Sequence, residues 1–114
     1  MKEFLIVQWK HNNLKDDPIY ILYQVNSDYY AEKIIEIFSN GSYNYEEKKE
    51  SDEYFLSERE LPDVETYNKE MENYNNNVES FFAKKIGYNT FNKIWLQVIN
   101  NKKVKTEQLD SFFK

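Results

Sequence analysis

Short runs of alternating residues, separated by turn-forming residues, occupy the first half of the chain and constrain its fold more than any other feature. Four runs have the length and composition of β-strands, at residues 4–10, 19–25, 29–38 and 43–47. The first is apolar on both faces, which predicts a strand inside a sheet. Asn40-Gly41 predicts a hairpin with a type I′ turn between the last two runs. This half therefore predicts an antiparallel sheet of about four strands.

Apolar residues at helical spacing follow in the second half. One stripe recurs at intervals of three and four residues, through Val64, Tyr67, Met71, Tyr74, Val78 and Phe81. Pro62, Asp63 and Glu65 favour a helix start at its beginning, because a fixed φ and negative charge both suit that end. The Asn residues at 75–77 either lie on the solvent face of this helix or break it into two pieces.

A second helix is predicted after Gly87, with Asn89 or Thr90 as its cap. Its apolar positions follow the i, i+3, i+4, i+7 pattern: Phe91, Ile94, Trp95 and Val98. We expect one α+β domain over residues 1–114, because a chain of this length fits a single core. Its parts are a sheet at 4–47, an acidic strand-end and loop at 46–62, a helical part at 63–99 and a C-terminal tail or short helix at 100–114. Two or three helices are expected to pack on one face of the sheet.

The composition excludes several kinds of chemistry. Two glycines are too few for a phosphate-cradling loop, and without Cys there is no thiolate nucleophile or cysteine zinc site. His11, the single histidine, is expected to be a surface residue, because no orienting partner or nucleophile accompanies it. Trp9 and Trp95 fit core positions better than base-stacking positions. We therefore expect no enzymatic activity, no cofactor and no metal ion.

Net charge and hydropathy exclude some classes of binding partner. A charge of −5 with one Arg disfavours nucleic acid, whose phosphates demand basic residues. No apolar run is long enough to span a membrane, and the N-terminus lacks a signal-peptide pattern. We therefore expect a cytoplasmic protein with no membrane partner.

The negative charge is concentrated in one segment. Nine of the 20 acidic residues lie between Glu46 and Glu65, together with only three of the 15 basic ones. Such a run is often merely solvating, and on charge alone a solvated loop and a binding surface are equally supported. Tyr43, Tyr45, Tyr54 and Phe55 favour the binding surface, since aromatic residues anchor protein interfaces. A basic macromolecular partner suits this segment best.

Short motifs in a fixed order resemble those of a family of small bacterial domains. They are Trp9-Lys10-His11, the pattern Glu-Ile-Phe-x-x-Gly at 36–41, a helix led by Pro62, and Ile86 followed by Phe91 and Trp95. The resemblance covers most of residues 4–96, and the segment around 70–77 and the tail after Asn100 depart from it. Members are similar to immunity proteins of contact-dependent growth inhibition systems, which are encoded in toxin–immunity loci.

The resemblance and the charge together suggest an immunity protein that binds and neutralises a cognate toxin, expected to be a basic nuclease domain. Electrostatic steering and steric blocking would be its mechanism. The expected partner-binding residues are Glu46, Glu47, Glu50, Asp52, Glu53, Tyr54, Glu58 and Glu60. The alternative is a non-enzymatic regulatory or small-ligand-binding domain that uses a crevice between sheet and helix.

Overall fold

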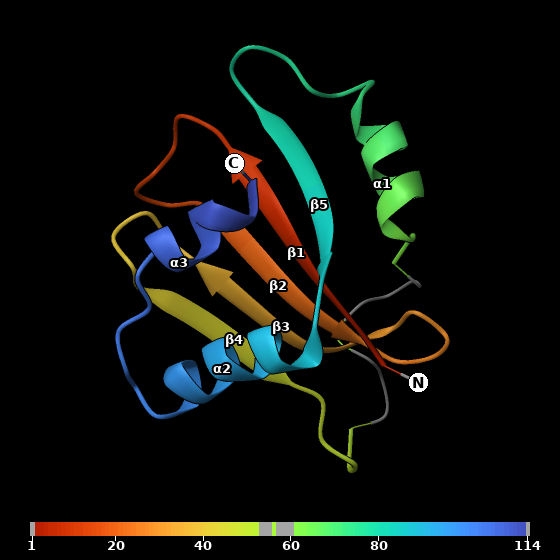
Figure 1. Ribbon diagram of the computed structural model, residues 1–114, viewed down its shortest axis with the longest axis vertical. Coiled ribbons are helices and arrows are strands. Elements are labelled where there is room, and N and C mark those ends of the chain that lie inside the picture. The colour runs from red at the N-terminus through yellow and green to blue at the C-terminus, as the bar shows by residue number, and fades with distance from the viewer. Residues whose placement is uncertain (1, 53–55, 57–60, 114) are drawn as a thin grey trace.

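The computed structural model describes residues 2–52, 56 and 61–113, which form one antiparallel sheet with helices packed against it (Figure 1). In chain order the elements are β1 (Glu3–Lys10), β2 (Tyr20–Val25), β3 (Ala31–Ile37), β4 (Tyr43–Glu47), α1 (Val64–Met71), β5 (Ser80–Ile86), α2 (Tyr88–Ile99), α3 (Glu107–Asp110) and the 3₁₀ helix η1 (Ser111–Phe113). Within the described residues the sheet has five strands in the order β4-β3-β2-β1-β5. The predicted α+β class is confirmed, with a fifth strand added.

The fifth strand lies where the sequence predicts part of a helix. Helix α1 ends at Met71, and β5 pairs antiparallel with β1. The helical stripe predicted as far as Phe81 is therefore wrong beyond Met71. Asn side chains explain the break: Asn76 Oδ1 accepts from the backbone N–H groups of Val78 and Glu79, and Asn75 bonds to the backbone of Phe81. Such bonds offer the backbone an alternative to the helix.

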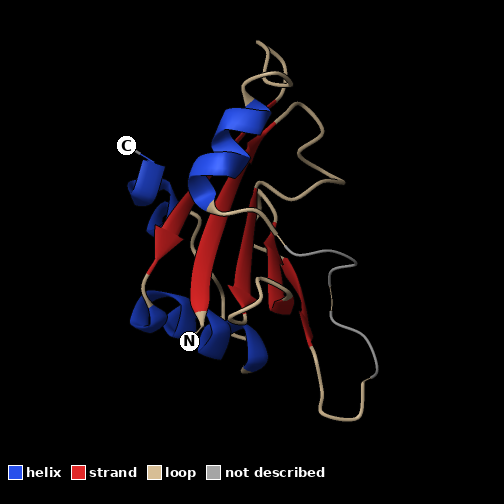
Figure 2. Ribbon diagram, turned by 90° about the vertical axis from the view of Figure 1, so that its right-hand side faces the viewer, coloured by secondary structure: helices blue, strands red, loops and turns tan. Residues whose placement is uncertain are grey.

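One side of the sheet, called here the core face, is covered by α2 and the C-terminal segment (Figures 1 and 2). Because side chains alternate along a strand, every second residue of β1, β2 and β3 points to this face. The buried cluster there comprises Phe4, Ile6, Tyr20, Leu22, Ile35, Ile37, Phe91, Ile94, Trp95, Val98, Val104 and Leu109. All four apolar positions predicted for the second helix are buried, which confirms its amphipathic pattern.

The start of α2 differs from the prediction. Gly87 is the N-cap, and the helix already includes Asn89 and Thr90 in its first turn. No side-chain hydrogen bond caps this end. The predicted cap at Asn89 or Thr90 is therefore wrong, because the strand β5 runs to Ile86 and leaves one residue for the connection.

Residues after Asn100 belong to the core. Val104 and Leu109 are fully buried, and the Phe112 carbonyl accepts from Lys84 Nζ on β5. The Tyr20 hydroxyl donates to Asp110 in α3. A tail is thus the wrong description of this segment, and a short helix the right one.

The hairpin between β3 and β4 forms at Asn40-Gly41 as predicted, but with another turn. Phe38 N–H donates to the Ser42 carbonyl and Gly41 N–H to the Phe38 carbonyl, which encloses a three-residue loop. Gly41 has φ of +85°, whereas Asn40 is not among the residues with positive φ. A type I′ turn needs positive φ at both central positions, so the loop is instead a type I turn closed by a left-handed Gly. A Cβ at Gly41 would lie 2.9 Å from the Val104 carbonyl oxygen.

Helix α1 lies apart from the core face. It packs beside β5, at the opposite end of the sheet from β4 (Figures 1 and 2). Asp63 caps it by accepting from Thr66 N–H at 2.8 Å, and this bond lowers the pKa of the Asp63 carboxyl. The prediction of two or three helices on one face is met by α2 and α3, while α1 covers part of the opposite, outer face. No helix within the described residues is both long and apolar enough to cross a membrane.

Candidate functional site

The acidic segment begins on β4, which is an edge strand of the sheet. Glu46 and Glu47 are consecutive, so their side chains point to opposite faces. Glu47 lies on the core face, where its carboxylate is 3.6 Å from Lys33 Nζ. Glu46 lies on the outer face, opposite Ile34 of β3. The structure therefore separates two carboxylates that the sequence predicts as one surface.

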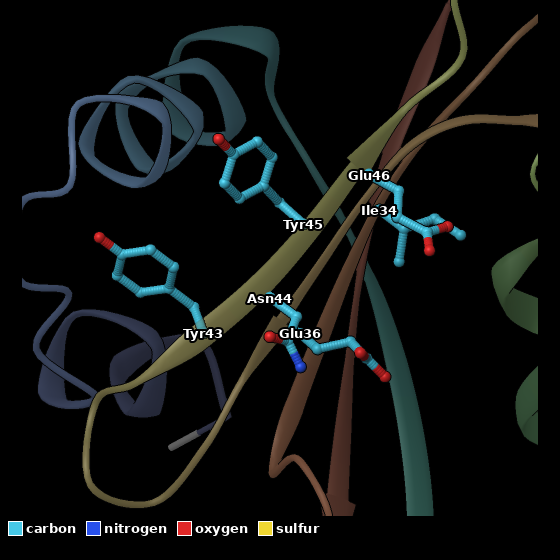
Figure 3. Close-up of a pocket in the computed structure, with 6 residues that line it drawn as sticks. All are labelled: Ile34, Glu36, Tyr43, Asn44, Tyr45 and Glu46. Atoms are coloured by element: carbon cyan, nitrogen blue, oxygen red, sulfur yellow. The ribbon is translucent and has the colours of Figure 1, made fainter.

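On the outer face Glu46 adjoins a different acid. Figure 3 shows Glu46, Ile34, Glu36 and Asn44 on one side of β4, while Tyr43 and Tyr45 project from the other side toward the helices. These six residues line a shallow hollow of about 590 Å³. Glu46 and Asn44 are exposed, and Glu36 and Ile34 are half-buried.

Glu36 is a site residue that the sequence reasoning missed. It sits in the third predicted strand, two residues from Ile34, and the pairing of Glu36 with Asn44 brings it beside the acidic segment. Neither Glu36 nor Glu46 has an ion-pair partner within the described part of the chain. The alternation of β3 was the signal that places Glu36 and Ile34 on one face.

The turn after β4 carries two more of the predicted residues. Glu50 and Asp52 are both exposed. Asp52 Oδ2 accepts from Lys49 N–H at 2.7 Å, and Asp52 N–H donates to the Lys49 carbonyl at 2.9 Å. Asp52 therefore shapes the turn, whereas no described contact engages the Glu50 carboxylate. The remaining predicted residues, Glu53, Tyr54, Glu58 and Glu60, lie outside the described residues.

Two aromatic residues of β4 join the acidic strand to the core. Tyr45 is 45% exposed, yet its ring packs edge-on against Trp95 with centroids 5.7 Å apart. The half-buried Tyr43 donates its hydroxyl to the Lys102 carbonyl at 3.0 Å. Tyr43 is thus mainly structural, and Tyr45 is the more exposed aromatic side chain of β4.

An apolar crevice of about 180 Å³ lies elsewhere on the outer face, between the sheet and α1. Its lining is Leu5, Val7, Ile21, Tyr23, Leu61, Pro62, Val64, Tyr67, Phe81 and Ala83. Asn68 fastens α1 to β5, since its side chain accepts from Ala83 N–H at 2.7 Å and donates to the Ala83 carbonyl at 2.9 Å. Helix α1 has no fully buried residue of its own, so this amide pair is a principal attachment.

Two tyrosines bring polar groups to the crevice. Burial raises the pKa of Tyr23 to about 12, with smaller contributions from Tyr67 and Glu36. Burial also raises the pKa of Tyr67. Both hydroxyls therefore stay neutral at physiological pH and are available as hydrogen-bond donors at an otherwise apolar site.

The other candidate residues have local partners. His11 Nε2–H donates to the Pro18 carbonyl at 2.8 Å, and Nδ1 accepts from Asn13 N–H at 3.0 Å, so both ring nitrogens hold the β1–β2 connection. Trp95 is in the core, as predicted. Trp9 is half-buried: it stacks on Phe81 and donates Nε1–H to Glu79 at 2.7 Å. Within the described ranges no group of three or more His, Cys, Asp or Glu side chains is placed to hold a metal ion.

Comparison with known families gives one match. The sequence profile described as a domain of unknown function (DUF6881) matches residues 3–100. No curated protein and no solved structure matches the chain. The matched range includes all five strands with α1 and α2, but stops before the buried residues Val104 and Leu109.

Proposed function

The chain belongs to the DUF6881 family, and we propose that it is an immunity protein. In this proposal it is a non-enzymatic cytoplasmic protein that binds a cognate bacterial toxin domain with a basic surface, such as a nuclease, and blocks that surface. The ordered sequence motifs support a toxin as the partner, because they resemble those of a family of small bacterial domains similar to immunity proteins. The acidic β4 region supports the site.

The observation that carries the proposal is the pair of carboxylates on the outer face. Glu36 and Glu46 flank Ile34, and both lack an ion-pair partner among the described residues. Exposed Glu50 extends the negative charge into the following turn. Uncompensated charges next to an apolar contact speed the encounter with a basic partner and fix its orientation. Like charges gathered without partners destabilise the free protein slightly, and a basic partner relieves this.

Charge reversal on this surface is the test. The double variant Glu46→Lys/Glu50→Lys is expected to slow association with the toxin about 10-fold or more at physiological ionic strength, because steering is lost. In this proposal the toxin is the variable C-terminal domain of a large secreted protein, which the neighbouring upstream gene is expected to encode. Stopped-flow or surface plasmon resonance gives the association rate, and survival of toxin-expressing cells gives the protection.

The matched control is Glu65→Lys/Glu70→Lys on α1, which makes the same change in net charge at two exposed positions near β5. It is expected to leave association within about two-fold of wild type, because α1 packs beside β5, at the opposite edge of the sheet from β4. Four strand spacings of about 4.8 Å exceed the Debye length of about 8 Å at physiological salt. Equal slowing by both variants would mean that net charge alone sets the association rate, and it would contradict the β4 surface as the binding site. An upstream domain that does not bind the wild-type chain would contradict the proposed function itself.

The apolar crevice beneath α1 favours a second candidate function, the binding of a small apolar molecule. Pockets for small ligands are mainly apolar with a few placed polar groups, as this one is with Tyr23 and Tyr67. Indole is a suitable probe, since it is apolar with a single N–H group. If the crevice is a ligand site, indole should shift the amide NMR signals of Val7, Ile21 and Ala83, and Ala83→Leu, which fills the crevice, should remove those shifts. Shifts that persist in Ala83→Leu would place the binding elsewhere.

A further inference from the structure

The outer edge of β4 carries backbone groups that no strand in the described part of the chain pairs with. The sheet order ends at β4, and four of its five residues are exposed. Among the strands of the described residues, none lies beyond it in Figure 1. An open edge is a template for another strand, and proteins commonly shorten or charge such edges to prevent unwanted pairing.

The hydrogen-bond register shows which groups are free. Phe38 donates to Ser42 at one end of the β3–β4 ladder, and Lys48 donates to Glu32 at the other. The register between these ends has no shift. Hydrogen-bonded pairs alternate with non-bonded pairs in an antiparallel ladder, so Asn44 and Glu46 bond inward to β3. Tyr43, Tyr45 and Glu47 therefore direct their N–H and C=O groups outward.

We propose that the toxin docks on this edge by adding an extended basic segment as a sixth strand next to β4. The inference rests on the proposed function, because the toxin is taken as the partner. Three outward N–H groups and three outward carbonyls give up to about six main-chain hydrogen bonds, the usual source of affinity in strand addition. The charge of β4 selects a basic occupant and disfavours a second copy of this acidic chain.

The side chains of β4 also specify the order of residues in the added strand. A residue opposite Glu46 lies on the outer face, where a Lys or Arg meets Glu46, while Glu36 adds negative charge on the same face one strand further in. A residue opposite Tyr45 lies on the core face, where an apolar or aromatic side chain extends the Tyr45–Trp95 contact. Glu47 is partly neutralised by Lys33 already, so the stronger demand for a cation is opposite Glu46. Cross-strand pairs of this kind stabilise neighbouring strands.

Amide hydrogen exchange of the wild-type chain tests the proposal without any substitution. In the free protein the amides of Asn44 and Glu46 are expected to exchange slowly, and those of Tyr43, Tyr45 and Glu47 quickly. With the toxin domain bound, the three fast amides are expected to slow by about 10-fold or more, while the slow pair changes little. Protection spread evenly over β4 and neighbouring strands, or absent from β4, would overturn the added strand.

Proline substitution provides the second measurement. Proline is tolerated on an edge strand where the N–H points to solvent, so Tyr45→Pro removes one outward donor and leaves the ladder to β3 intact. Tyr45→Ala is the matched control, because it also loses the ring but keeps the N–H. We expect Tyr45→Pro to bind the toxin domain at least 10-fold more weakly than Tyr45→Ala does. Glu47→Pro against Glu47→Ala repeats the comparison at the next outward amide.

The outcomes separate the docking mode from the function. If wild type binds and the Pro and Ala variants bind equally, the edge is not the docking site, although the immunity proposal stands. If wild type does not bind the toxin domain, both proposals fall. If light scattering shows a dimer of the free chain that Tyr45→Pro dissociates, the edge serves self-association instead.

Discussion

A chain shortened to residues 1–100 is expected not to fold, although it contains the whole range matched by the family profile. Truncation removes Val104 and Leu109, both fully buried against the core face. It also uncovers Tyr20, whose ring stacks on Phe113 and whose hydroxyl donates to Asp110. Full burial of one such aliphatic side chain contributes about 1.5–3 kcal/mol. Small domains have a total stability of only about 5–15 kcal/mol. Urea unfolding followed by circular dichroism is expected to show no cooperative transition for this chain.

A point substitution tests the role of the C-terminal segment with a smaller change to the structure. Leu109→Ala is expected to reduce the free energy of unfolding by about 2–5 kcal/mol, because it leaves a cavity at a fully buried site. Lys105→Ala, at an exposed position of the same segment, is the control and is expected to stay within about 0.5 kcal/mol of wild type. A shortened chain that unfolds cooperatively at the wild-type urea concentration would show that the C-terminal segment is dispensable.

Trp95→Ala is expected to reduce the free energy of unfolding by about 3–5 kcal/mol, because it removes a large buried aromatic side chain. Trp95 is only 5% exposed and stacks with Phe91 at a centroid distance of 6.3 Å. On its other sides it contacts the Tyr45 ring and receives Lys33 Nζ at 4.6 Å from the ring centroid. The indole therefore joins the core to both β3 and β4, and its removal leaves a large cavity.

Leu96→Ala is the matched control for Trp95. Leu96 follows Trp95 on α2 but points away from the sheet and is 46% exposed. It is expected to change the free energy of unfolding by less than about 1 kcal/mol, measured by the same urea titration. A loss of similar size in both variants would mean that the helix itself, and not the packing of Trp95, carries the effect.

Trp95→Ala also connects stability with the candidate site. Tyr45 loses its edge-on partner in this variant, and Lys33 loses the ring beneath its ammonium group. The β4 edge is then less firmly held, so faster amide exchange at Asn44 and Glu46 is expected even under conditions where the protein remains folded. The core face thus supports the geometry of the strand that we propose as the docking edge.

Regular patterns explain what could be predicted about the fold. Period-2 alternation identified β1 to β4, and the 3.6-residue repeat identified the buried face of α2. The pattern failed at residues 72–86, because a spacing of three and four residues continues by coincidence through Val78 and Phe81. Asn75 and Asn76 end the helix by bonding to the backbone, an effect that a hydrophobic pattern does not record.

The sequence predicted only part of the candidate site, and the reason is geometric. The excess of acid after β3 was visible in the sequence, and Glu46 and Glu50 do lie on the exposed surface. The distribution of charge along the sequence does not show to which face of the sheet each side chain points, however. Side chains alternate along a strand, so Glu47 lies on the core face beside Lys33. Glu36 joins Glu46 because β3 and β4 pair in a particular register. The proximity of Glu36 and Glu46 therefore depends on the pairing of the two strands and cannot be read from either strand alone.

The sequence by itself determined the antiparallel order of the first four strands, the apolar stripe of α2 and the concentration of negative charge after β3, because all three are local patterns along the chain. The tertiary structure alone decided that β5 closes the other edge, that α1 covers an apolar crevice, and that residues after Asn100 complete the core. It also decided that β4 is an edge strand among the described residues, with the backbone N–H and C=O groups of Tyr43, Tyr45 and Glu47 directed away from β3. These depend on contacts between residues far apart in sequence, which local propensity does not encode.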